Sequence, residues 1–147
     1  MFSKEEALQI KKDFWIEFAK EYPREWLLYN TKIKDVTLKF YVDNKMAQVS
    51  MNIECKDDEK RKIYFEKMES LKTILHEEHL PDAVFEKDFY LPSGKLISKI
   101  WVETDGVCVN NKATWPKIFD FFNEKMSAFE YFFYEYQDYI SDLEINT

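Results

Sequence analysis

The segment from Thr114 to Ile140 most constrains what this chain can fold into, because it is long, aromatic and free of glycine. Its apolar residues recur at helical spacing and form two neighbouring stripes. The main stripe comprises Trp115, Ile118, Phe119, Phe122, Met126, Phe129, Phe133, Tyr136 and Ile140, and the second comprises Phe121, Ala128, Phe132 and Tyr139. Together they cover roughly half of a helical wheel drawn at about 100° per residue. An ordinary surface helix needs less, so this helix is expected to pack on a sheet and on something else.

The second stripe predicts an interface. Phe121, Phe132 and Tyr139 would form an exposed apolar patch if nothing covered them, and monomers normally avoid such patches. We therefore expect the three rings to be buried either under the N-terminal helix or across the interface of a homodimer. Phe122 and Phe129 lie at the centre of the main stripe and are expected in the core.

Length and composition indicate one domain over residues 1–147, with enough apolar residues for a core. Aromatic residues make up 18% of the chain, which argues against disorder. With only two glycines, a glycine-rich phosphate loop is excluded. The first residues carry no secretory signal pattern and no run of about 18 apolar residues occurs, so we expect a cytoplasmic protein without a membrane span. Cys55 and Cys108 are then expected to be reduced thiols.

The net charge of −7 favours protein partners over nucleic acids, because phosphate contacts need local positive charge. Lysines 32, 34 and 39 lie near Tyr29 and Tyr41 and could form a small basic patch. The favoured interpretation is a solvent-facing row of lysines on a strand. Trp15, Trp26 and Trp115 are interpreted as core residues, while the position of Trp101 is open.

The first half of the chain predicts a helix followed by three strands. Ser3 and Glu6 match a capping box, and Pro23 ends the helix. Trp26–Tyr29 is typical of a short buried strand. Two runs with period-two alternation then surround a turn at residues 43–45 and predict a hairpin, Val36–Val42 with Met46–Ile53.

The second half repeats this order. Asp57 or Asp58 caps a second helix that ends before Pro81. A hairpin follows, Val84–Leu91 with Lys95–Thr104, and the Asp105-Gly106 turn precedes a short strand at Val107–Val109. Thr114 caps the last helix, with Pro116 in its first turn. The predicted order is α-βββ-α-βββ-α, an α+β fold with a largely antiparallel sheet built from hairpins.

Several long stretches of the chain resemble a known family. They are F-S-K-E-E-A near the start, Y-P-R-E-W-L-L-Y-N-T-K-I-K-D from Tyr22, S-G-K-L-I-S-K-I-W-V-E from Ser93 and T-W-P-K-I-F-D-F-F-N-E-K-M-S-A-F-E from Thr114. Over nearly its whole length the chain resembles the bacterial family called domain of unknown function 4268. The resemblance implies no activity. Some members form the C-terminal part of longer proteins whose N-terminal part is similar to a restriction-type nuclease. This resemblance implies a nucleic-acid or defence context but identifies no catalytic residue in this chain.

One pattern is typical of an enzyme. Restriction-type nucleases hold a metal ion with an Asp and a Glu on adjacent strands, and a Lys two residues after the Glu positions the attacking water. Asp35, Glu54 and Lys56 follow that order, and the predicted hairpin places Asp35 opposite residues 52–54. The alternative function is therefore a Mg²⁺-dependent nuclease. Because Glu-x-Lys is common in a chain that is 33% charged, we favour a structural role for these residues.

His76 and His79 are spaced i, i+3 at the end of the second helix, a spacing that can hold a transition metal. No third ligand is evident, and histidines in a last helical turn also suit the helix dipole without any ligand. The sequence as a whole favours a non-catalytic binding or accessory module without a cofactor. We expect it to act through protein–protein contact, either with another protein or as a homodimer.

Overall fold

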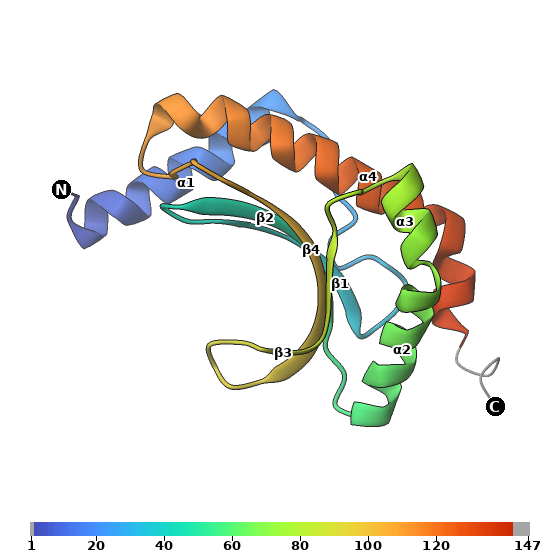
Figure 1. Cartoon of the computed structure of the whole chain (residues 1–147). Helices are drawn as coiled ribbons and strands as arrows, with labels where there is room; N and C mark the ends of the chain where they lie inside the picture. Colours follow the sequence, from blue (N-terminus) through green and yellow to red (C-terminus); the bar gives the residue numbers. More distant parts are fainter. Residues whose placement is uncertain (1, 143–147) are drawn as a thin grey trace.

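The computed structural model describes residues 2–142 and shows a curved sheet with helices along its outer face (Figure 1). Within these residues the helices alternate with two strand pairs along the chain. The helical elements are α1 (Lys4–Glu21), α2 (Asp58–Ser70), α3 (Lys72–Glu78), the short 3-10 helix η1 (Lys112–Thr114) and α4 (Trp115–Ser141). The predicted α+β class and the long aromatic C-terminal helix are confirmed.

The sheet consists of two hairpins joined side by side. Its strands are β1 (Val36–Val42), β2 (Met46–Ile53), β3 (Val84–Tyr90) and β4 (Leu96–Asp105). All neighbouring pairs are antiparallel, and the order across the sheet is β1-β2-β4-β3. Both predicted hairpins are therefore confirmed, and the contact between them is made by the second strand of each.

The two short predicted strands are wrong, so the observed order is α-ββ-αα-ββ-α. In the segment Trp26–Tyr29, Leu28 adopts a left-handed conformation with φ of 43°, which an extended strand does not allow. Leu28 contacts β1 by one backbone bond, in which its carbonyl accepts from the Leu38 amide at 3.0 Å. The amide of Leu27 donates to a side chain on α4 instead of a strand.

Val107–Val109 also forms no strand. The Val109 amide donates to the Asp43 carbonyl at 3.0 Å, but the Cys108 amide donates to the hydroxyl of Thr114. Thr114 precedes α4 as predicted, yet its hydroxyl bonds this loop and makes no cap bond to the helix. The predicted second helix is interrupted at Leu71, which divides it into α2 and α3.

The two other predicted caps are present. The hydroxyl of Ser3 accepts from the Glu6 amide and the Glu6 carboxylate accepts from the Ser3 amide, which completes the capping box of α1. A carboxylate oxygen of Asp57 accepts from the amides of Glu59 and Lys60 at the start of α2. These bonds satisfy amide groups that the first helical turn leaves unpaired.

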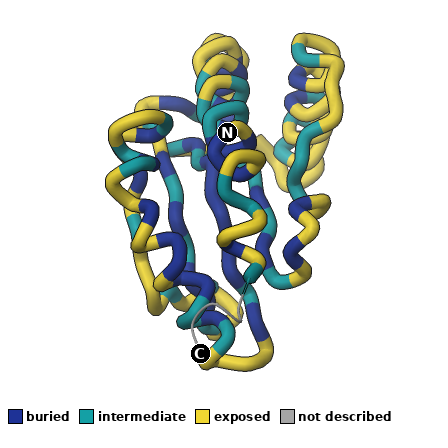
Figure 2. Tube along the Cα trace, turned by 90° about the vertical axis from the view of Figure 1, so that its right-hand side faces the viewer, coloured by how far each residue is buried: buried dark blue, intermediate teal, exposed yellow. Residues whose placement is uncertain are grey.

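The core lies between the sheet and the helices, and α4 crosses all of it. Phe122 and Phe129 have no exposed surface, as expected from the main stripe. Phe14 and Phe18 of α1 pack on the first half of α4, with ring centroids 5.1 to 6.2 Å from its phenylalanines. Figure 2 shows buried residues where helices and strands face each other and exposed ones on the outer turns.

The second half of α4 packs on α2 and on His79, the residue that follows α3. Phe132 is fully buried, and its ring meets that of His79 edge-on at 5.6 Å. The Tyr139 hydroxyl lies 2.8 Å from the hydroxyl of Ser70, and the buried Lys67 ammonium donates to the Tyr139 carbonyl at 2.7 Å. Phe121 is partly buried against the core. Phe132 and Tyr139 of the second stripe thus contact the region of α2 and His79, not α1, whereas Phe121 and Tyr139 keep exposed surface. A homodimer interface over this stripe stays a prediction.

Arg61 fastens α2 to the outer strand β3. Its side chain is only 1% exposed, and every N–H group of its guanidinium has an acceptor. The acceptors are the carboxylates of Asp58 and Asp88, the hydroxyl of Ser98 and the carbonyl of Lys87. Lys87 and Asp88 form the irregular stretch of β3, where its register with β4 shifts. The bulge of this edge strand is therefore held by a side chain from the helix layer.

Both cysteines are free. Cys55 is a core residue with 9% of its surface exposed, and burial, with a smaller contribution from Asp35, raises the pKa of its thiol to about 12. Cys108 is more exposed. The two thiols therefore differ in their expected reactivity, because the thiolate is the reactive form.

We predict that Phe122→Ala and Phe129→Ala each lower the free energy of unfolding by about 3–5 kcal/mol, the usual loss for a buried aromatic ring. Urea unfolding followed by circular dichroism measures it. Tyr131→Ala is the matched control, since Tyr131 lies on the same helix but is 70% exposed, and it should cost less than about 0.5 kcal/mol. Equal losses for all three variants would contradict the assignment of the buried face.

We also predict that a thiol reagent at pH 8 modifies Cys108 in the folded protein and leaves Cys55 unmodified. At this pH only ~1 in 10,000 Cys55 thiols would be ionised, and the side chain is shielded from solvent. Mass spectrometry should find one modified cysteine per chain before denaturation and two after it. Rapid double modification of the folded protein would contradict the burial of Cys55.

Candidate functional site

A groove of about 700 Å³ opens between the end of α1, the segment 23–30 and the outer strand β1. Its walls are largely aromatic, and two cations lie at its margin. The principal lining residues are Trp15, Phe18, Tyr22, Trp26, Tyr29 and Phe40, with Arg24 and Lys39. This volume is in the range of pockets that hold an inserted side chain or a small ligand. We refer to it as the aromatic groove.

Three side chains contact the ring of Trp26 in the wall of the aromatic groove. Phe18 stacks on it with an interplanar angle of 11° at 5.8 Å, and Phe40 meets it edge-on at 5.3 Å. The guanidinium carbon of Arg24 lies 3.8 Å from the ring centroid, a distance typical of a cation–π contact. Trp26 is therefore held in one orientation before any partner arrives.

Glu130 of α4 fixes the segment that carries Trp26. Its carboxylate is buried, at 4% exposure for the residue, and accepts from the Arg24 guanidinium at 2.6 Å and from the Leu27 amide at 2.7 Å. Bonds of a carboxylate to a charged donor are among the stronger ones in proteins. Glu130 thus supplies a hydrogen-bond acceptor to the segment that was predicted to be a strand.

The segment before β1 contains two left-handed residues that are not glycine. Leu28 has a φ of 43° and Lys32 a φ of 64°. Such conformations are uncommon and persist only where surrounding contacts enforce them. The fully buried Thr31 supplies such contacts, with its hydroxyl 2.6 Å from the Val36 carbonyl. Strained backbone conformations cluster at functional sites, and here they lie beside the aromatic groove.

Tyr22 ties the end of α1 to α4 at the rim of the aromatic groove. Its hydroxyl donates to the Asp120 carboxylate at 3.0 Å. Partial burial and, to a smaller extent, this bond raise the pKa of Tyr22, so the phenol keeps its proton. The ring is therefore a neutral wall of the groove.

Further apolar and aromatic side chains are exposed on α1 and at the aromatic groove. On α1, Leu8 and Ile16 are 61% and 53% exposed, and Tyr29, which lines the groove, is 72% exposed. A second hollow of about 430 Å³ shares Arg24 and is bordered by Tyr131 and Tyr134 of α4. Trp, Tyr and Arg are the residue types that dominate the binding energy of protein interfaces.

The predicted nuclease residues do not form an open acidic site. The Glu54 amide donates to the Asp35 carbonyl at 2.8 Å, so the two residues are neighbours, in agreement with the predicted register. Asp35 pairs with Lys60 of α2 at 3.2 Å, whereas Glu54 pairs with Lys39 and Lys95 at 3.4 Å each. Lys56 is exposed. Among residues 2–142 no group of three His, Cys, Asp or Glu side chains is placed to hold a metal ion.

The two histidines contact different parts of the chain. A ring nitrogen of His76 lies 2.8 Å from the Ala83 carbonyl. His79 packs on Phe132, and its ring nitrogen lies 4.0 Å from the Glu135 carboxylate. Each histidine thus has its own protein neighbours, and a shared metal is still only a prediction of the spacing.

No pattern in the sequence predicted the aromatic groove. Trp15 and Trp26 were expected in the core and residues 26–29 in a strand, whereas Trp15 is 37% exposed and Trp26 half-buried. Trp115 is core as expected, at 5% exposure. The lysines at positions 32 and 34 lie in the loop before β1, so they do not form a row with Lys39 on a strand. The one available signal was the density of Tyr, Trp and Arg between Tyr22 and Tyr29.

No helix in the described part of the chain is long and apolar enough to cross a membrane. Comparison with curated proteins and with solved structures gave no match to this chain. A family model does match, over residues 10–137, and that range includes the aromatic groove, the sheet and most of α4. The match covers most of the chain and agrees with the resemblance of its long stretches. The chain therefore belongs to the family described as domain of unknown function (DUF4268).

Proposed function

We propose that the chain is a non-catalytic binding module that acts through protein–protein contact, with the aromatic groove as its contact site. The observation that carries this proposal is the open groove of about 700 Å³ around a fixed Trp26. Such a groove accepts an apolar or aromatic side chain from a partner. The exposed Tyr29, Tyr131 and Tyr134 around it supply further contact area.

The rigidity of the groove supports binding. Glu130, Thr31 and the ring contacts of Trp26 hold the groove wall within the free protein. The groove wall then loses less conformational entropy on association than a mobile surface would. The partner is another protein or a second copy of this chain, as expected from the net charge and the aromatic content.

The alternative function, a metal-dependent nuclease, receives less support. Asp35 and Glu54 are each paired with lysines of separate elements, and these pairs would have to break for the two carboxylates to share one ion. Lys56 is exposed and forms no ion pair with either carboxylate among the described residues. A direct assay of nucleic-acid cleavage tests this alternative.

We predict that a random peptide display library selected on the folded chain yields peptides with an aromatic or branched apolar anchor. Trp26→Ala should weaken their binding at least tenfold, because a fully buried aromatic contact is worth roughly 2 kcal/mol or more. Isothermal titration calorimetry measures the affinities. Tyr90→Ala is the matched control, since Tyr90 is 67% exposed on β3, and it should leave the affinity unchanged.

The same variants test self-association. If the partner is a second copy, sedimentation velocity should show a dimer that Trp26→Ala dissociates and Tyr90→Ala does not. The proposal fails if the wild-type chain is monomeric and the library yields no peptide that distinguishes Trp26→Ala from Tyr90→Ala.

We further predict that the chain cleaves neither DNA nor RNA in the presence of Mg²⁺ or Mn²⁺. A gel assay with single- and double-stranded substrates checks this, with Asp35→Ala, Glu54→Ala and Lys56→Ala as controls for contaminating enzymes. Cleavage by the wild-type chain that each of the three variants abolishes would establish the nuclease function, because each change removes a metal ligand or the charge that positions water.

A further inference from the structure

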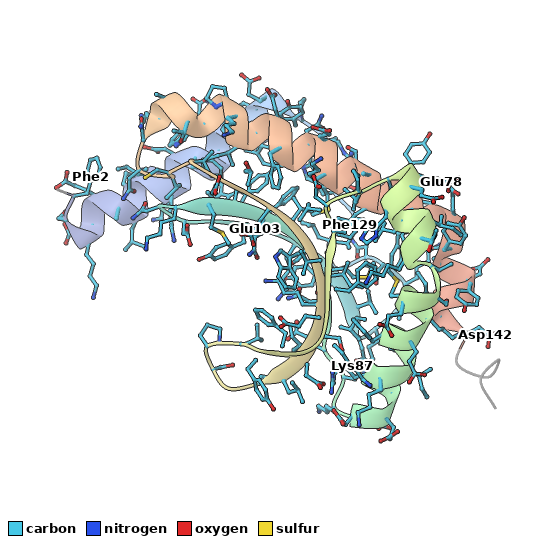
Figure 3. The ribbon with its side chains drawn as sticks, viewed as in Figure 1. Phe2, Glu78, Lys87, Glu103, Phe129 and Asp142 are labelled. Carbon is cyan, nitrogen blue, oxygen red and sulfur yellow. The ribbon has the colours of Figure 1, made fainter. Side chains whose placement is uncertain are left out.

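The inner face of the curved sheet is free of helices in the described chain (Figure 1). Along β2, residues 47, 49, 51 and 53 belong to the core, so the alternate residues Gln48, Ser50 and Asn52 lie on the opposite, inner face. Figure 3 labels Glu103 on this side and Phe129 between the sheet and α4. Side chains on the inside of a curved sheet converge, so residues from several strands can contact one ligand.

Two rows of cross-strand neighbours form the floor of this face. One row joins Thr37 of β1, Asn52 of β2 and Lys99 of β4. The next row joins Ser50 of β2 to Trp101 of β4, with Lys39 on β1. The floor is thus polar at its centre, on β2 and β4, which each have a neighbouring strand on both sides.

Two polar side chains of this floor have a buried atom without a hydrogen-bond partner within residues 2–142. These atoms are the Asn52 side-chain oxygen and the Thr37 hydroxyl. Asn52 is 5% exposed, and its neighbour on β2, Ser50, is equally buried. A buried polar group without a partner destabilises the folded state. Two such groups on paired positions of β1 and β2 indicate that a partner outside the chain completes them.

Aromatic and amide side chains lie next to the unpaired polar groups. The Lys99 ammonium lies 4.5 Å from the ring centroid of Phe89 and 4.9 Å from that of Trp101, and it donates to the Gln48 side-chain oxygen at 2.9 Å. Glu103 accepts from the Gln48 amide and from the indole N–H of Trp101. These bonds orient the Trp101 ring and leave a half-buried aromatic side chain next to the unpaired polar groups.

The charges of the inner face balance one another. Lys39 and Lys95 both pair with Glu54 at 3.4 Å. Lys99 is flanked by the charges of Glu86 and Glu103. Each of these three lysines thus has acidic neighbours, which disfavours a phosphate chain on this face, and the acidic net charge of the protein opposes one further. A neutral ligand fits the face better.

We propose that the inner face of the sheet binds a neutral oligosaccharide. A pyranose ring has an apolar face that packs on Trp101 and hydroxyl groups that both donate and accept, as the unpaired groups of Thr37 and Asn52 require. A peptide is a poorer occupant, because its backbone groups pair with the edge of a sheet, whereas Asn52 and Trp101 lie on the central strands β2 and β4. This site is centred on β2 and β4, whereas the aromatic groove lies between β1, the end of α1 and the segment 23–30, and Lys39 borders both.

The first test is an NMR titration of the ¹⁵N-labelled chain with cellohexaose, xylohexaose, maltohexaose, laminarihexaose and chitohexaose. At least one of these sugars should shift the amide resonances of β2 and β4. Trp101→Ala should weaken that binding at least tenfold, while Tyr90→Ala should not, because Tyr90 alternates with Phe89 and lies on the other face of β3. No shift with any of the five sugars, or binding that survives Trp101→Ala, would overturn the proposal. Binding of oligothymidylate at β2 and β4 without any sugar binding would overturn it in favour of a single-stranded nucleic acid.

The second test separates binding from folding. Thr37→Val keeps the side-chain shape and removes the unpaired hydroxyl, so it should raise the melting temperature while weakening sugar binding several-fold. This variant has no partner to lose and is expected to fold. A lower melting temperature would mean that the hydroxyl makes a stabilising bond within the chain, and the inference from unpaired groups would then be wrong.

Discussion

The burial of α4 is the constraint on which the rest of the structure depends. This helix carries two apolar stripes, and the sheet covers only one of them. The first half of the helix is completed by α1 through Phe14 and Phe18, and the second half by α2 and His79 through contacts to Tyr139 and Phe132. All helices therefore gather on the outer face of the sheet, and the inner face has no helix within the described residues.

The same helix also supplies the polar contact that shapes the aromatic groove. Glu130 lies among the buried residues of α4 and bonds the Leu27 amide, 103 residues away along the chain. A buried carboxylate is costly unless its oxygens are paired. Glu130 is paired on both oxygens, so it holds the segment 23–30 against α4 in a conformation that no strand would give. Arg61 acts similarly at the opposite edge of the sheet, where it fastens the bulge of β3 to α2.

Local signals predicted much of this fold. The turn at residues 43–45, the Pro92-Ser93-Gly94 turn and the Ser3–Glu6 capping box each act over a few residues, and each is present. The neighbouring positions of Asp35 and Glu54 followed from the hairpin register in the same way. The lysines that neutralise these carboxylates come from β1, α2 and the turn before β4, and no local pattern reveals these pairs. The segment 26–29 was misassigned for the same reason, because its hydrogen-bond partner is a side chain on a distant helix.

Several features of the structure that folding does not explain lie at two surfaces. Left-handed Leu28 and Lys32 lie beside the aromatic groove, and the unpaired groups of Thr37 and Asn52 lie on the inner face. The unpaired ring nitrogen of His79 lies apart from both surfaces, against Phe132. Arg61, although buried and charged, has all of its donors paired. Valine at position 37 would have the same shape as threonine and would leave no unpaired hydroxyl. The unpaired polar groups on the concave side of β1 and β2 are best explained by a ligand that pairs them, because stability alone favours their replacement.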